Sequence, residues 1–314
     1  MSSQLLVRTM TAESDGVLSI ELVDPEGHEL PPWEPGAHVD VQLAAGLSRQ
    51  YSLSGDPHDR RRYRIAVLRE PAGRGGSAYV HDALRPGHLV GYTGPRNHFR
   101  LEPSPAYLFI AGGIGITPIL PMVARVEAEG RRWRLMYGGR TASSMAFTDE
   151  LAPRGDRVTL HPQDARGLLD LDALLGSAQP DTLVYCCGPE PLLRAVEDRM
   201  AAWPAESLRL ERFAAPEQPA RDPASEHVVE VVLAESGRTL TVGPETSILQ
   251  ALLDAGIDHD HDCTEGICGT CETKVIDGEV DHRDYVLTQR EKDAGDCMMV
   301  CVSRACGNRL VLGL

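Results

Sequence analysis

The sequence has no long hydrophobic run. Its most apolar stretch, AYLFIAGGIGITPIL at residues 106–120, is too short and too rich in glycine to span a bilayer. The opening residues, MSSQLLVRTM, lack the basic region and apolar core of a secretory signal. We therefore expect a cytoplasmic protein that does not bind a membrane. In that reducing compartment its eight cysteines are expected to be ligands, catalytic groups or buried thiols rather than disulfides.

The sequence also has little positive charge. It contains 31 Lys and Arg against 46 Asp and Glu, a formal net charge of −15, which argues against nucleic acid as a partner. Residues 227–314 hold 7 Lys and Arg against 16 Asp and Glu, so a net charge of −9 is concentrated there. Such a surface favours docking to a basic protein, and a plain solubility charge is the alternative.

The length of the sequence predicts several domains, because 314 residues are more than one hydrophobic core typically contains. Short alternating runs up to about residue 101 are typical of an antiparallel barrel or sandwich. Apolar strands then alternate with helices, which predicts a parallel sheet covered by helices. A proline-rich stretch, AAPEQPARDPASE, has the composition of a linker, and a hairpin followed by a helix comes after it. The expected segments are 1–103, 104–213, 214–226 and 227–314.

Three cysteines lie in one short loop, and a fourth follows at a distance. Cys263, Cys268 and Cys271 have four and two intervening residues, and Cys301 follows after 29 more. This arrangement matches the plant-type spacing for a 2Fe-2S cluster. Zinc sites usually present two pairs, and the second pair is absent, so zinc or accidental buried thiols are the lesser alternatives. Spacing alone leaves Cys297 and Cys306 as competing fourth ligands.

Two motifs in the first domain stand out, and the second is compatible with a bound phosphate. RQYSL at 49–53 ends a predicted barrel strand, and GRGGS at 73–77 opens a helix-like stretch. Glycines ahead of a helix leave backbone N–H groups free for a phosphate, and Ser77 adds a hydroxyl group. Taken separately, each motif is more often an exposed strand face or an ordinary turn.

Two motifs in the second domain join a strand to a helix. GGIGITP at 112–118 permits a tight turn and the close approach of a dinucleotide pyrophosphate. Pro118 departs from a full GxGxxG pattern, and a plain turn is the alternative. YCCGP at 185–189 places Cys187 at the carboxyl end of a parallel strand, where such folds position ligand-facing residues, although a buried thiol is the alternative.

Together with YGGR at 137–140 and RLERF at 209–213, these motifs occur in an order that resembles the phthalate dioxygenase reductase family of FMN- and iron–sulfur-containing reductases. The resemblance covers nearly the whole chain. It implies an antiparallel β-barrel flavin domain, an α/β parallel-sheet nicotinamide domain and an α+β (β-grasp) plant-type ferredoxin domain. MMVCVSRA at 298–305 looks like the fourth-ligand segment of such ferredoxin domains. The resemblance therefore selects Cys301 and leaves Cys297 and Cys306 as non-ligand thiols.

The resemblance also implies an FMN site. Arg49 would hold the phosphate, Tyr51 would lie against the isoalloxazine ring, and the Ser52 hydroxyl would reach flavin N5. The other implied positions are the backbone of Ala66, Val67 and Leu68 along the flavin edge, Gly75, Gly76 and Ser77 around the phosphate, Thr117 near the ring, and Phe213 beside the flavin.

For the nicotinamide coenzyme, the resemblance places Gly113 and Gly115 at the pyrophosphate, Arg140 at the adenosine side and Cys187 near the nicotinamide. The strand end YGGR, followed by TASS, lacks the acidic residue that would reject a 2′-phosphate, so NADPH is not excluded. The resemblance favours NADH.

The three cofactors have one sensible order. A nicotinamide coenzyme yields two electrons as a hydride and an iron–sulfur cluster accepts one, so a flavin must stand between them. The protein positions the groups, and Ser52 and Cys187 are the residues expected to place nicotinamide C4 over flavin N5.

The implied function is the reductase component of an oxygenase system that passes single electrons to a terminal oxygenase, either a Rieske-type aromatic oxygenase or a demethylase. Alternatives are a reductase for a haem monooxygenase, and a ferredoxin-like electron carrier or redox sensor with a vestigial flavin domain. We expect a monomer whose oxygenase docks near the acidic ferredoxin domain, at Asp258, Asp260, Asp262 and Glu265.

Overall fold

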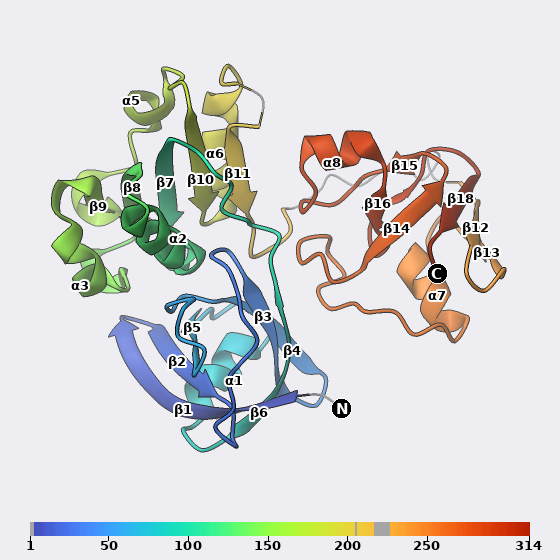
Figure 1. Ribbon diagram of the computed structural model, residues 1–314, viewed down its shortest axis with the longest axis horizontal. Coiled ribbons are helices and arrows are strands. Elements are labelled where there is room, and N and C mark those ends of the chain that lie inside the picture. Colours follow the sequence, from blue (N-terminus) through green and yellow to red (C-terminus); the bar gives the residue numbers. More distant parts are fainter. Residues whose placement is uncertain (1–2, 205, 217–226) are drawn as a thin grey trace. The chain divides into compact units, whose positions relative to one another are not determined.

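A computed structural model describes residues 3–204, 206–216 and 227–314. The chain divides into two compact units, Met1–Glu211 and Arg212–Leu314, coloured blue to yellow and orange to red in Figure 1. Of the expected linker, residues 217–226 lie outside the described residues. Within the described ranges, no helix is both long enough and apolar enough to cross a membrane.

The first unit begins with a six-stranded antiparallel sheet in the order β4-β3-β6-β1-β2-β5. Apolar Val39, Val41 and Leu43 alternate along β3 with polar residues, of which Asp40 is buried and Gln42 is exposed. After β4, the N–H of Ser54 donates to the carbonyl of Arg64 in β5 at 2.8 Å, so the two ends of the sheet approach each other. The elements are β1 (Ser3–Ser14), β2 (Val17–Val23), β3 (His38–Ala44), β4 (Leu47–Ser52), β5 (Tyr63–Leu68), α1 (Gly76–Asp82) and β6 (Leu89–Arg96).

The same unit continues into a five-stranded sheet in the order β11-β10-β7-β8-β9, in which every pair is parallel. The chain starts at the central strand β7, winds outward to β9 and returns to the other side at β10. The strands are β7 (Ala106–Gly112), β8 (Arg132–Gly139), β9 (Val158–Pro162), β10 (Thr182–Cys187) and β11 (Leu208–Glu211). The helices are α2 (Ile116–Ala128), α3 (Thr148–Leu151), α4 (Gln163–Arg166), α5 (Leu171–Leu175) and α6 (Glu190–Met200), with 3₁₀ turns at Gly113–Gly115, Ala142–Ser144 and Ala152–Arg157.

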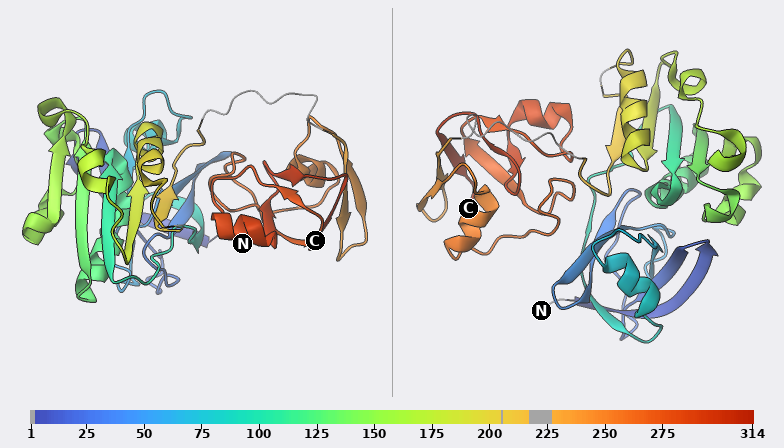
Figure 2. Two further views of the ribbon diagram at one scale, coloured as in Figure 1. Left: turned by 90° about the horizontal axis from the view of Figure 1, so that it is seen from above. Right: turned by 180° about the vertical axis from the view of Figure 1, so that it is seen from behind.

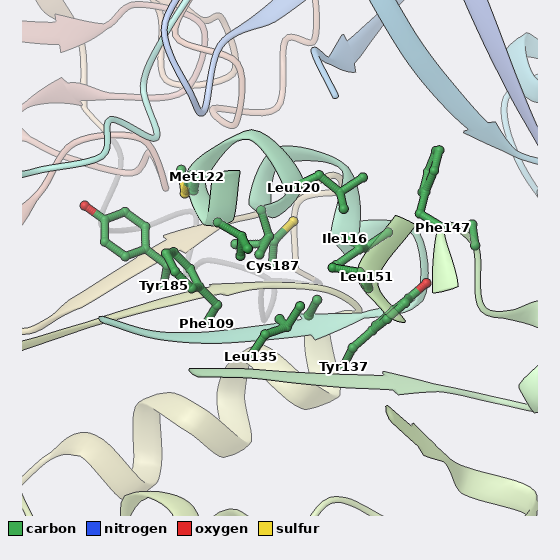
Figure 3. Packing of buried hydrophobic residues seen from close by; sticks show 14 of the residues in the cluster. Phe109, Ile116, Leu120, Met122, Leu135, Tyr137, Phe147, Leu151, Tyr185 and Cys187 are labelled. Atoms are coloured by element: carbon green, nitrogen blue, oxygen red, sulfur yellow. The ribbon is translucent and has the colours of Figure 1, made fainter. Parts of the chain in front are cut away.

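Helices cover both faces of the parallel sheet, which explains why all seven residues of β7 are buried. Phe109 and the other odd-numbered residues of β7 pack against α2, while Leu108 and Ile110 pack against α5 and α6. Figure 3 shows Phe109, Leu135 and Tyr137 on the face that α2 covers, and Figure 2 shows the helices of this layer from two further directions.

The antiparallel and parallel sheets share one hydrophobic core. Val17 of β2 and Ala66 of β5 belong to the same buried cluster as Ile116 of α2 and Phe147. Phe147 has φ 60° and ψ 21°, a left-handed conformation that costs a non-glycine residue about 1–3 kcal/mol. The core contacts of its ring must compensate for that cost.

The second unit is an α+β domain, as expected. Its mixed sheet has the order β13-β12-β18-β14-β16, and a short pair, β15-β17, stands apart from it. Ile248, Leu249 and Leu252 of α7 pack into the same core as the sheet. The elements are β12 (Val229–Leu233), β13 (Thr239–Val242), α7 (Ile248–Asp254), β14 (Glu272–Asp277), β15 (Val280–Asp281), α8 (Gln289–Ala294), β16 (Cys297–Met299), β17 (Arg304–Ala305) and β18 (Arg309–Leu312).

A buried arginine ties three segments of this domain together. The Arg304 guanidinium donates to the carbonyl oxygens of Thr246 at 2.7 Å, His227 at 2.9 Å and Gly243 at 3.1 Å. These carbonyls lie before β12, after β13 and before α7. Arg304 therefore fixes the hairpin and the helix to the strand that follows Cys301.

We predict that Arg304→Met lowers the stability of the second unit by at least about 2 kcal/mol, because each buried acceptor left unpaired costs about 1–3 kcal/mol. The matched control is Arg309→Met. Arg309 is 53% exposed and pairs with Asp277 on the surface, so its loss is expected to cost less than about 1 kcal/mol. The urea midpoint for loss of the visible cluster absorbance measures both, and equal midpoints would contradict the assigned role of Arg304.

Candidate functional site

The loop between α7 and β14 gathers the four predicted cluster ligands. Cys263, Cys268, Cys271 and Cys301 are all buried. The Cys263 thiol hydrogen-bonds to those of Cys268 and Cys301, and Cys271 to that of Cys301. Across the described ranges, no three His, Cys, Asp or Glu side chains are arranged around a single metal ion. The pairwise linkage of four thiols fits a cluster of two irons, with two thiols for each.

Two backbone N–H groups of the loop point at cysteine sulfurs, where they would stabilise the thiolate form that binds a metal. The backbone N–H of Glu265 points at Cys263 Sγ at 3.3 Å, and that of Thr270 points at Cys268 Sγ at 3.4 Å. Hydrogen bonds among the four thiols lower the pKa of Cys263 and Cys271 and raise the pKa of their partners Cys268 and Cys301. N–H donors to sulfur also help to set the reduction potential of a bound cluster.

A turn in the second half of the domain supports the cluster loop. The N–H of Tyr285 donates to the carbonyl of Gly266 at 2.9 Å. A Cβ on Gly266 would lie 2.7 Å from Val302 Cγ2, so only glycine fits. The buried Asp284 carboxylate accepts the N–H groups of Val286 and Leu287, at 3.1 and 2.8 Å, and fixes the turn. Sequence reasoning did not single out Asp284, because its role depends on a contact across the domain.

The competing cysteines have different surroundings. Cys297 is half-buried at the start of β16 and hydrogen-bonds to Glu272, and Cys306 is exposed. These surroundings fit the expectation that neither thiol is a ligand.

The two flavin motifs meet beside α1. The Arg49 guanidinium donates to the carbonyl of Arg74, and a Cβ on Gly76 would lie only 2.5 Å from Arg49 Cγ. Gly75 has a left-handed backbone, with φ 84°, just before α1. The Ser77 hydroxyl accepts the N–H of Glu70 at 3.0 Å. RQYSL and GRGGS therefore form one locality of the fold.

Tyr51 carries a buried polar atom that fits a bound ligand. Its hydroxyl has no hydrogen-bond partner within the described part of the chain. Leaving such a group unpaired costs about 1–3 kcal/mol, and a polar group of FMN would relieve that cost. Strand β5 carries Ala66, Val67 and Leu68. It is an edge strand of the described sheet, in which its neighbour is β2.

The nicotinamide motifs lie side by side at the carboxyl ends of β7 and β10, where the strand order reverses. Open α/β sheets bind ligands at this point. A Cβ on Gly115 would lie 2.2 Å from the carbonyl oxygen of Cys187, so this glycine is required for packing of the two turns. Gly113, with φ 56°, faces open space. Gly113 is therefore the position where a ligand can approach the backbone.

One residue that the sequence reasoning missed connects the two expected catalytic residues. Glu211, at the end of β11, is in register with Cys187. Its Oε2 lies 3.4 Å from Ser52 Oγ and 3.8 Å from Cys187 Sγ. Desolvation raises the pKa of Glu211 to about 8 and also raises that of Cys187. Glu211 is part of the motif RLERF, but its place beside Cys187 follows only from the pairing of β10 with β11.

The remaining expected residues have varied surroundings. The buried Thr117 hydroxyl donates to the carbonyl of Ile114 at 3.0 Å, on the helix that follows the GGIGITP turn. Arg140 is exposed after β8, and its carbonyl accepts the N–H of Asp164 at 3.0 Å. An acidic residue is thus present beside this strand end, although it comes from α4, the helix that follows the neighbouring strand β9. Phe213 belongs to the second unit, and its side chain is 43% exposed.

Comparison with known proteins extends these observations. Residues 231–306 match the family described as "2Fe-2S iron-sulfur cluster binding domain". The chain is 43% identical to "Phenoxybenzoate dioxygenase subunit beta" of Ectopseudomonas oleovorans, over 99% of this chain and 97% of that protein. It is 40% identical to "Phthalate dioxygenase reductase" of Burkholderia cepacia, over 95% and 93%.

Two solved structures match the chain closely. One is described as phthalate dioxygenase reductase, "a modular structure for electron transfer from pyridine nucleotides to [2Fe-2S]", with TM-score 0.70, 38% identity and coverage of 99% and 97%. The other is an intact type IV self-sufficient cytochrome P450 monooxygenase, with TM-score 0.96 and 46% identity. This chain spans 41% of that longer protein.

The three-part architecture and its gathered thiols define a pyridine-nucleotide-dependent iron–sulfur oxidoreductase. Identity above 30% over nearly the full length makes the membership specific: the chain belongs to the phthalate dioxygenase reductase family.

We predict that Cys301→Ser abolishes the 2Fe-2S cluster, whereas Cys297→Ser and Cys306→Ser retain it. The reason is that the Cys301 thiol contacts two other buried thiols, while the control thiols do not share those surroundings. Iron and acid-labile sulfide content, with the visible spectrum, measure the outcome. A normal spectrum in Cys301→Ser would show that another residue is the fourth ligand.

Proposed function

We propose that the protein is the reductase component of an oxygenase system, taking a hydride from NADH onto FMN and passing single electrons through a 2Fe-2S cluster to a terminal oxygenase. The observation that carries this proposal is the meeting of Ser52, from the antiparallel sheet, with Cys187, from the parallel sheet, at the carboxyl group of Glu211. A site made by two sheets suits a reaction between two bound cofactors.

At the flavin end, the chain would bind and orient. Arg49 and the left-handed turn at Gly75 present a cation and backbone N–H groups to a phosphate, and Tyr51 offers its unpaired hydroxyl. When bound, FMN accepts two electrons together and releases them singly. Gly76, Ser77, Thr117 and the backbone of Ala66, Val67 and Leu68 complete the proposed FMN site. These intact features argue against a vestigial flavin domain.

At the coenzyme end, Gly113 would admit the pyrophosphate to the backbone, while Gly115 holds the turn against Cys187. Arg140 would meet the adenosine side. The neighbouring Asp164 supplies negative charge that disfavours a 2′-phosphate, so NADH is the proposed coenzyme. The segments 1–103, 104–213, 214–226 and 227–314 are the proposed flavin, nicotinamide, linker and ferredoxin regions.

The terminal oxygenase is proposed to dock beside the cluster loop, with the reductase acting as a monomer. Asp258 and Asp260 are exposed there, and Asp262 and Glu265 are half-buried. Negative charge at this rim would steer a basic partner surface and make the association sensitive to salt.

A haem monooxygenase is the second candidate acceptor. The observation that favours it is the TM-score of 0.96 to part of a self-sufficient cytochrome P450. The favoured acceptor remains a Rieske-type oxygenase or demethylase, because relatives over nearly their full length carry names such as "Phthalate 4,5-dioxygenase oxygenase reductase subunit" and "Vanillate O-demethylase oxidoreductase".

We predict that the purified protein, containing one FMN per chain, oxidises NADH with an artificial one-electron acceptor and reduces candidate Rieske oxygenases faster than P450 enzymes. Added salt is expected to slow oxygenase reduction but not dye reduction, because only the former requires protein docking. Absence of NADH oxidation with every acceptor would refute the reductase function. Faster reduction of a P450 would reverse the order of the two acceptors.

We predict a pH dependence that belongs to Glu211. Its raised pKa means that the group is protonated below about pH 8 and becomes a carboxylate as the pH rises through that value. A new negative charge beside Ser52 opposes negative charge developing on the flavin, so flavin reduction by NADH should slow above about pH 8. Glu211→Gln should remove this inflection, as measured by stopped-flow flavin bleaching. An unchanged pH profile in the variant would assign the inflection elsewhere.

The raised pKa of Glu211 also makes the stability of the folded protein depend on pH. The folded protein holds the proton to a higher pH than the unfolded chain does, so the stabilisation is complete below the unfolded pKa and is lost as the pH rises through about 8. Glu211→Gln should lack this loss, which provides an independent check by urea denaturation.

A further inference from the structure

A single arginine on the flavin-binding strand reaches the nicotinamide domain. Arg64 lies in β5, two residues before Ala66. Its NH1 pairs with Glu150 Oε2 at 2.9 Å, and its guanidinium carbon lies 5.0 Å from the centre of the Phe147 ring. Its NH2 also donates to the carbonyl of Ser54, where the ends of the antiparallel sheet meet. Arg64 therefore connects the antiparallel sheet to the α3 segment of the parallel-sheet half.

The residue beneath Arg64 has an unusual backbone. Phe147 is buried in the shared core and adopts a left-handed conformation that bulky residues rarely occupy. It immediately precedes α3, which carries Glu150. In Figure 3 its ring lies at one end of the cluster, near Tyr137 and Leu151. The strained backbone of Phe147 thus lies where the Arg64 guanidinium stacks on its ring.

A second contact between the sheets lies on the same segment. At the β1–β2 turn, the N–H of Asp15 donates to the carbonyl of Ser143 at 2.9 Å, and the Ser14 hydroxyl donates to the carbonyl of Ser144 at 3.2 Å. Residues 141–150 are thus held by the antiparallel sheet at both ends. The segment begins directly after Arg140, which the proposed function places at the coenzyme.

We infer that Arg64 is a positioning residue for hydride transfer. It fixes residues 141–150, which directly follow Arg140, to strand β5, whose next residues line the proposed flavin site, so that both reactants are held by one rigid framework. This inference rests on the proposed function. In the step concerned, the C4–H bond of NADH breaks and an N5–H bond forms on FMN, so NADH is oxidised and FMN is reduced by two electrons.

The expected signature is a change of rate without a matching change of affinity. Arg64 is placed at neither reactant, so its loss should loosen the geometry between them and leave most binding contacts intact. Near-attack distances are strict, and a misplacement of about 1 Å can cost on the order of a hundredfold in rate. We therefore expect the limiting rate of flavin reduction in Arg64→Gln to fall roughly ten- to a hundredfold, with the Kd for NADH changed less than about threefold.

The test is anaerobic stopped-flow reduction of the full-length protein by NADH and by 4-deuterated NADH. Arg62→Gln is the matched control, because Arg62, in the loop before β5, pairs with Glu21 of β2 at 2.8 Å and with Asp59 of the same loop at 2.7 Å, so that both of its ion pairs lie within the antiparallel-sheet half. Arg62→Gln is expected to reduce its flavin at the wild-type rate. Arg64→Gln should slow and show a larger deuterium isotope effect on the limiting rate, which a loss of stability alone would not produce.

Two conservative variants cover the case in which Arg64→Gln loses its FMN. Arg64→Lys keeps a charge for Glu150 but loses the planar stack on Phe147, and Glu150→Gln does the reverse. Each should give a smaller loss of rate than Arg64→Gln, at full FMN content. Wild-type limiting rates and isotope effects in these variants would overturn the inference, as would equal rates in Arg64→Gln and Arg62→Gln. A wild-type protein that NADH does not reduce at all would overturn the proposed function itself.

Discussion

Much of this molecule depends on the hydrophobic core shared by its antiparallel and parallel sheets. Val17 and Ala66 are buried with residues of α2 and β10 in one cluster, so the two sheets cannot separate without exposing apolar surface. That constraint lets side chains far apart in sequence, Ser52 and Glu211, approach each other. It also makes a strained Phe147 tolerable, since its ring is buried in the same core. The proposed hydride site therefore depends on packing as much as on its polar groups.

The division of the chain after Glu211 matches the physical demands of the two electron-transfer steps. Hydride transfer requires two atoms in near contact, and the residues proposed for it lie almost entirely in one compact unit. Transfer of a single electron does not require two atoms in contact. The main structural requirement on the cluster domain is therefore that its own loops hold the cysteines in place. That order comes from Arg304, Asp284 and the N–H groups directed at the cysteine sulfurs.

The elements with strong patterns were predictable from the sequence. The apolar run of β7, the alternation along β3 and the β12–β13 hairpin followed by α7 are confirmed. The family resemblance is also confirmed. Local sequence carries these features, because burial on one or two faces imposes a period on the residues themselves.

What the sequence did not reveal depends on neighbours across strands. Glu211 matters because β11 pairs with β10, and Asp164 matters because the end of β9 lies beside that of β8. Neither pairing is encoded in a spacing along the chain. Cys263, Cys268 and Cys271, by contrast, lie on one short loop, which is why their spacing along the chain was informative. The roles assigned to individual flavin and coenzyme residues remain proposals.

The two glycines of the GGIGITP turn have different consequences for redesign. The carbonyl of Cys187 occupies the space next to Gly115, so any side chain at Gly115 would push the two turns apart. Gly113 has open space around its missing Cβ, and its left-handed backbone is one that asparagine also tolerates. One short motif thus contains a position that has no room for a side chain and another that has room for one.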